Sequence, residues 1–150
     1  MPDEQGQDSP EPAAPEPRAL TLRDWRAAKQ DVRGVFARLE AAGFVALAGA
    51  GSTQPEGFDA CAETLVARGG RVADLVGFCY YTRQDAHSAR GKGWLPLAFW
   101  GAPDGSTGPM VRAGEAVVRA FREAGFTVSW DGSEHTRPVL DLTRPRATHP

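Results

Sequence analysis

The chain has 150 residues, 41% of them hydrophobic, which suits one domain with a buried core. Its 17 Lys and Arg against 19 Asp and Glu give a formal net charge of −2, so the strong basic field of a nucleic-acid-binding protein is absent. Two cysteines do not make a disulfide scaffold, no secretory signal is visible, and no segment approaches the roughly 20 apolar residues of a membrane span. We therefore expect a cytoplasmic protein with no nucleic-acid or membrane partner.

The first 18 residues differ in composition from the rest of the chain. They contain five of the 12 prolines and, apart from Met1, no large apolar residue. Such a segment cannot bury enough surface to offset the entropy of ordering it. We predict a disordered acidic tail over 1–18, a single domain over 19–143 and a C-terminal tail over 144–150.

A helix is predicted over 22–42. Thr21 and Asp24 resemble a capping box at its start, with Asp in place of Glu or Gln. Apolar residues then recur at mostly helical spacing, and Gly43 supplies the left-handed residue that ends the helix. The apolar run 44–47 is typical of a short strand.

A glycine-rich segment, 49–53, joins this strand to a second predicted helix over 58–67. Phosphates are often bound where a strand meets a helix. However, the full glycine fingerprints are absent and no Lys follows the glycines, so we interpret the segment as a turn. Gly69 and Gly70 end the helix.

The segment 75–82 is apolar at both odd and even positions, which indicates a strand covered on both faces. Another strand is predicted over 94–100, where Pro96 cannot donate a ladder hydrogen bond and belongs at the start or on an edge. A helix opened by Pro109 and ended by Gly125 follows. Two further strands, over 126–130 and 138–142, are joined by a turn at Asp131-Gly132. The order of these elements predicts an α+β fold, with helices packed on a mixed sheet of about five strands.

Three motifs resemble a family of small bacterial proteins known only as a domain of unknown function. They are Gly77-Phe78-x-Tyr80-Tyr81-x-x-Gln84-Asp85, Gly93-Trp94-Leu95-x-Leu97-Ala98-Phe99 and Gly125-Phe126-x-Val128-x-Trp130-Asp131-Gly132. The resemblance covers roughly residues 34–142 and implies no known activity, substrate or cofactor. Similar proteins tend to carry a cysteine cluster after the first strand, which is missing here, and Pro96 replaces an aromatic residue in the middle strand.

A polar cluster follows the apolar strand and holds the candidate ligand-binding residues: Tyr80, Tyr81, Gln84, Asp85 and His87. Asp85 could act as a general base or a ligand carboxylate, with a tyrosine as hydrogen-bond donor. Alternatively, Asp85 caps a short helix over 86–90 and Gln84 satisfies backbone groups of the loop. We favour the capping interpretation. We assign no catalytic residue, metal or cofactor, since no spacing brings His87 and His135 together with a further ligand.

Trp94 and Trp100 are candidates for a partner surface, although core packing is the simpler interpretation. Cys61 and Cys79 are expected to be buried as small hydrophobes. Because no catalytic set is complete, we predict a non-catalytic module that binds another protein, as a monomer or weak dimer. The alternative is a small-ligand-binding protein or a hydrolase-like enzyme that uses the polar cluster. A pocket near Asp85 would favour the alternative, and an exposed apolar patch with either tryptophan would favour the first hypothesis.

Overall fold

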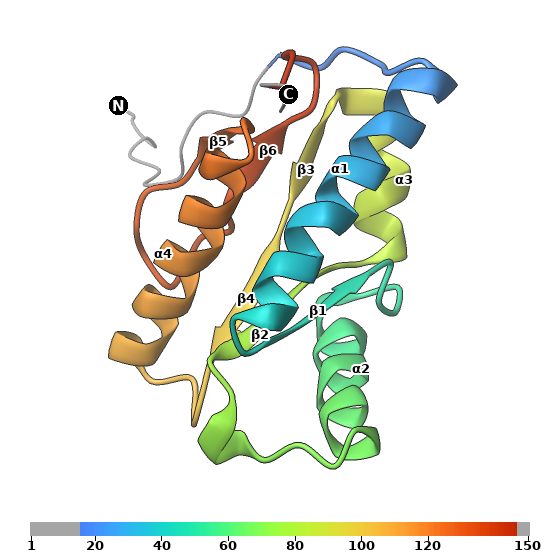
Figure 1. Cartoon of the computed structure of the whole chain (residues 1–150). Helices are drawn as coiled ribbons and strands as arrows, with labels where there is room; N and C mark the ends of the chain where they lie inside the picture. Colours follow the sequence, from blue (N-terminus) through green and yellow to red (C-terminus); the bar gives the residue numbers. More distant parts are fainter. Residues whose placement is uncertain (1–15, 147–150) are drawn as a thin grey trace, which may run out of the picture.

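The computed structural model describes residues 16–146, so residues 1–15 of the tail predicted over 1–18 and residues 147–150 of the tail predicted over 144–150 lie outside the described part. The described part has an α+β fold, as predicted (Figure 1). Its elements in chain order are α1 (Leu22–Ala41), β1 (Phe44–Ala48), α2 (Gln54–Ala67), the 3-10 helix η2 (Val72–Asp74), β2 (Gly77–Tyr81), α3 (Arg83–Lys92), β3 (Trp94–Pro96), β4 (Ala98–Gly101), α4 (Thr107–Glu123), β5 (Thr127–Ser129) and β6 (Val139–Asp141).

The strands form two sheets of three strands each, and not the single sheet of about five that the sequence predicts. In the first sheet β2 lies between β1, which is parallel to it, and β4, which is antiparallel. In the second sheet β6 lies between β3 and β5, and both pairs are antiparallel.

The predicted strand over 94–100 explains this difference, because it is divided between the two sheets. Pro96 ends β3 on the edge of the second sheet, and the Leu97 N–H donates to the carbonyl of Pro138 at 2.9 Å. The chain then continues as β4, which pairs with β2. Figure 1 shows β3 and β4 as one nearly continuous ribbon that joins the sheets. The ladder hydrogen bonds of Gly93 and Leu97 to the β6 side lie before and after Pro96, so the missing N–H of the proline falls on the free edge of β3, where a proline is tolerated.

Strand β2 is the interior strand that its composition predicts, since all five of its residues are buried. Cys79 and Tyr81 belong to the larger hydrophobic core. Phe78 and Tyr80 belong to a smaller core on the opposite face, where α2 packs. Alternate side chains of a strand point to opposite faces, which is why both parities are apolar.

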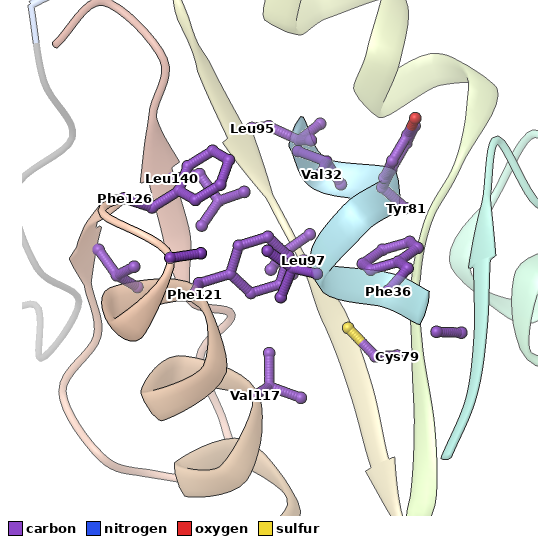
Figure 2. Close-up of a cluster of buried hydrophobic side chains, with 14 of the residues drawn as sticks. Val32, Phe36, Cys79, Tyr81, Leu95, Leu97, Val117, Phe121, Phe126 and Leu140 are labelled. Atoms are coloured by element: carbon purple, nitrogen blue, oxygen red, sulfur yellow. The ribbon is translucent and has the colours of Figure 1, made fainter. Parts of the chain in front are cut away.

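The larger core lies between the two sheets and the helices α1 and α4 (Figure 2). Phe121 of α4 is fully buried at its centre, with its ring centroid 6.0 Å from that of Phe36 of α1. The same ring lies 5.1 Å from Phe126, and the Phe126 N–H donates to the Phe121 carbonyl at 3.0 Å. This closure after Gly125, with φ of 91°, is the one predicted for the end of the helix.

The helix α2 begins at Gln54, earlier than the predicted start at residue 58. Thr53 is its N-cap, and the Glu56 carboxylate accepts the Thr53 N–H in return, which completes a capping box. The Thr-x-x-Glu pattern and the following Pro55 are sequence signals for this start that the hydrophobic periodicity alone does not reveal.

Both ends of the described chain are bound to the domain. The Arg18 N–H donates to the Lys92 carbonyl at 2.7 Å, at the end of α3. Near the other end, Arg146 forms an ion pair with Asp31 of α1 at 2.6 Å. These contacts hold the two ends of the described part, at Arg18 and Arg146, against α3 and α1 respectively.

Candidate ligand-binding cleft

The two tyrosines at the end of β2 point to opposite faces of the sheet. The Tyr80 hydroxyl donates to the Gln54 carbonyl at 2.8 Å, and its ring packs over Gly57 of α2. Burial raises the pKa of Tyr80 to about 12, because the phenolate would lose its hydration. Tyr80 therefore joins α2 to the sheet and does not share a site with Tyr81.

Tyr81 lies at the outer edge of the larger core. Its ring is 6.0 Å from Phe36, and its hydroxyl oxygen points out of the cluster in Figure 2. Burial raises the pKa of Tyr81 above its ordinary value, and the positive charge of Arg33 acts in the opposite direction. Within residues 16–146 its hydroxyl forms no hydrogen bond that meets normal geometry.

Asp85 takes part in a capping box, but the helix that it caps starts earlier than predicted. Thr82 is the N-cap of α3, the Asp85 N–H donates to the Thr82 hydroxyl, and the Asp85 carboxylate accepts the Thr82 N–H, both at 3.0 Å. Arg137 also donates to both oxygens of that carboxylate, at 3.1 and 3.2 Å. The carboxylate is thus occupied by structural contacts, and Arg137 is a partner that the sequence analysis missed.

A cleft of about 310 Å³ lies between α1, α3 and the carboxyl ends of the parallel strands β1 and β2. Ligands of open α/β sheets bind in this position relative to parallel strands. Of the five candidate residues, Tyr81 and His87 line the cleft, whereas Tyr80, Gln84 and Asp85 do not. The lining residues are Trp25, Lys29, Arg33, Ala48, Gly49, Tyr81, Arg83, Ala86, His87 and Arg90.

Four lining side chains are positively charged and none is a carboxylate. Lys29 and Arg33 come from α1, and Arg83 and Arg90 from the first and last turns of α3. In the described part of the chain, none of the four is in an ion pair. Arg83 donates to the Ser52 hydroxyl at 3.0 Å, and Lys29 lies 5.6 Å from the centre of the Trp25 ring.

These cations were not among the sequence candidates, although the spacing contained a signal. Trp25, Lys29 and Arg33 recur every fourth residue, so they form one stripe along α1. Arg83, His87 and Arg90 form a similar stripe along α3. Nothing in the sequence shows that the two stripes face the same cleft, because that depends on how α1 and α3 are placed in the folded domain.

The glycine-rich loop over 49–53 is a turn whose amides are used within the protein. The Ala50 N–H donates to the Tyr81 carbonyl at 2.9 Å. The N–H groups of Ser52 and Thr53 donate to the Glu56 carboxylate at 2.7 and 3.3 Å. These three amides are therefore not free to bind a phosphate, and the basic side chains are the groups that can interact with an anion.

The two tryptophans proposed for a partner surface are both half-buried. Trp100 packs against Phe78 and Phe58, with centroid distances of 5.0 and 5.5 Å. Trp94 lies under the Lys92 ammonium at 4.7 Å, and its buried indole N–H has no hydrogen-bond partner among the described residues. The large hydrophobic residues that are exposed lie elsewhere, at Leu22, Val66, Val72 and Val76.

Cys61 and Cys79 are buried free thiols. Burial raises the pKa of Cys61 to about 12 and raises that of Cys79 as well. Within residues 16–146, no three His, Cys, Asp or Glu side chains gather as a metal site would require. None of the helices in that range is long and apolar enough to cross a bilayer.

The cleft and both sheets fall within a segment that matches a known family. The family described as Domain of unknown function (DUF6891) matches residues 22–143. The chain belongs to this family. The DUF6891 segment runs from the first residue of α1 to just beyond β6 and includes every residue that lines the cleft. Searches of curated proteins and of solved structures give no match.

Proposed function

We propose that this protein binds a small anionic ligand in the cleft between α1 and α3. The observation that carries the proposal is the charge of the lining, which has four basic side chains and no carboxylate. The position of the cleft at the carboxyl ends of β1 and β2 supports it, as does the presence of two predicted site residues, Tyr81 and His87.

The floor of the cleft favours an organic anion over a bare inorganic ion. The half-buried Ala48 and Ala86 provide apolar surface beside the cations, and Trp25, which is 7% exposed, adds only a small part of the lining. Pockets for small molecules combine such apolar walls with a few polar groups that fix orientation. The low-dielectric floor also strengthens the attraction between the basic side chains and an anion.

The protein-binding hypothesis depends on an exposed apolar patch that includes Trp94 or Trp100. Trp100 is covered by Phe58 and Phe78, and neither Trp94 nor Trp100 belongs to the exposed large hydrophobic residues. The cleft therefore supports the small-ligand alternative better. A protein-binding role, a cytoplasmic location and a monomeric or weakly dimeric state stay predictions from the sequence.

Two-dimensional amide NMR of the full chain tests the proposal. Small organic anions, with neutral amides of the same shape as controls, should shift the resonances of α1 and α3 residues that line the cleft. A ligand that binds only the folded state also raises the melting temperature. Arg90→Gln should weaken both effects, while Arg119→Gln on the exposed surface of α4 removes the same charge and should leave them unchanged. Equal effects of anions and neutral amides would refute the proposal.

A further inference from the structure

The arrangement of cations in the cleft indicates more than a general preference for anions. Lys29 and Arg33 are separated by one turn of α1, and Arg83 and Arg90 lie on α3, with His87 between them. Like charges one turn apart on a helix repel each other. Lys29 and Arg33 are such a pair, Arg83 and Arg90 are seven residues apart on α3, and no carboxylate of the lining offsets the four charges. A singly charged ligand would compensate only part of this charge, whereas a dianion would compensate more of it.

The donors also approach the cleft from different directions. Arg33 extends from α1, whereas Arg83 and Arg90 extend from opposite ends of α3. One planar carboxylate is matched by a single guanidinium fork, but the oxygens of a tetrahedral phosphate accept hydrogen bonds from several forks. The Tyr81 hydroxyl, which points out of the core, adds a neutral donor at the edge of the cleft.

The size of the cleft limits the organic part of the ligand. A volume of about 310 Å³ is at the lower end of the range for small-molecule pockets, roughly 300–1,000 Å³. Ala48 and Ala86 supply the apolar wall on which a small organic group could lie, with the edge of Trp25 beside them.

Building on the proposed function, we infer that the ligand is a small phosphate monoester. Its doubly charged phosphate lies among Arg33, Arg83 and Arg90, and its organic group lies against the half-buried Ala48 and Ala86. Side chains bind the phosphate here, since the loop amides of Ala50, Ser52 and Thr53 are occupied.

Isothermal titration calorimetry with three probes of similar size tests this inference. Phenyl phosphate is a dianion above its second pKa of about 6, phenyl sulfate is a tetrahedral monoanion, and benzoate is a planar monoanion. At about pH 8 and about 0.15 M salt, where long-range attraction is screened, phenyl phosphate should bind at least tenfold more tightly than either monoanion. The advantage should shrink severalfold at about pH 5, where the phosphate carries one charge.

The outcomes separate this inference from the proposed function. Failure of all three probes to bind would overturn both. Binding of benzoate or phenyl sulfate as tightly as phenyl phosphate would overturn the phosphate assignment and leave the anion cleft standing. Arg33→Gln and Arg90→Gln should each weaken phenyl phosphate at least tenfold, and Arg119→Gln should have no effect. Far-UV circular dichroism and melting temperatures that match those of the parent show that a variant is folded, and only then is its loss of binding evidence for the site. An unchanged affinity for phenyl phosphate in either folded variant would refute the site.

Discussion

The contacts of Asp85 predict that its removal is costly to stability. In Asp85→Ala, the Thr82 N–H loses its acceptor within a residue that is only 2% exposed, and Arg137 loses both of its hydrogen bonds. Loss of a capping acceptor costs about 1 kcal/mol. A charge-assisted hydrogen bond contributes about 1.5–3 kcal/mol when shielded. The Arg137 side chain is 31% exposed, so the lower end applies, and we expect a loss of about 2 kcal/mol in the free energy of unfolding.

Arg137→Ala should cost less, about 1 kcal/mol, because the Thr82–Asp85 capping box stays intact. Urea denaturation followed by circular dichroism measures both losses, and a double-mutant cycle should show a coupling energy of about 1 kcal/mol between the two side chains. Asp59→Ala, an exposed position on α2, is the control and should change stability by less than about 0.5 kcal/mol. A loss below about 0.5 kcal/mol in Asp85→Ala, or strictly additive losses in the double mutant, would show that this reasoning is wrong.

Four further predictions concern the packing and burial of single residues. In Gly57→Ala the new methyl group would collide with the Tyr80 ring, so unfolding assays should show a loss of about 1–3 kcal/mol despite the better helix propensity of Ala. Gly34→Ala on α1, which meets nothing within 4 Å, should instead stabilise by roughly 0.5–1 kcal/mol. Because the pKa of Tyr80 is raised from 10.0 to about 12, its contribution to stability is complete below about pH 10 and is lost as pH rises through about 12. If the free energy of unfolding of Tyr80→Phe fell with pH as steeply as that of the parent in this range, the prediction would be wrong. Cys61 and Cys79 should not react with a thiol reagent at neutral pH until the protein unfolds, and rapid labelling of the native state would refute their burial.

The sequence predicted those strands and helix ends that are determined by interactions between residues close together in the chain. Apolar residues at both odd and even positions around Cys79 identified the interior strand, and the left-handed glycines at 43 and 125 identified two helix ends. The division of the strand after Pro96 was not predicted, because a proline indicates an edge position but not which strands pair with the segments before and after it.

The site was predicted less well than the fold for the same reason. Tyr81 ends the central strand and His87 follows it, and this position made both of them candidates in the sequence. Arg33 and Arg90 reach the same cleft from helices that meet only in the folded protein. The ion pair of Asp85 with Arg137 joins residues 52 positions apart, and no motif connects them.

The ribbon from Trp94 to Gly101 has a mechanical consequence. One continuous stretch of backbone is a member of both ladders, so neither sheet can detach without pulling on the other. This ribbon begins immediately after α3, the helix that provides one wall of the cleft. A ligand bound between α3 and α1 would therefore also stabilise the segment that belongs to both sheets. Ligand binding should then slow or oppose the unfolding of strands that do not contact the ligand.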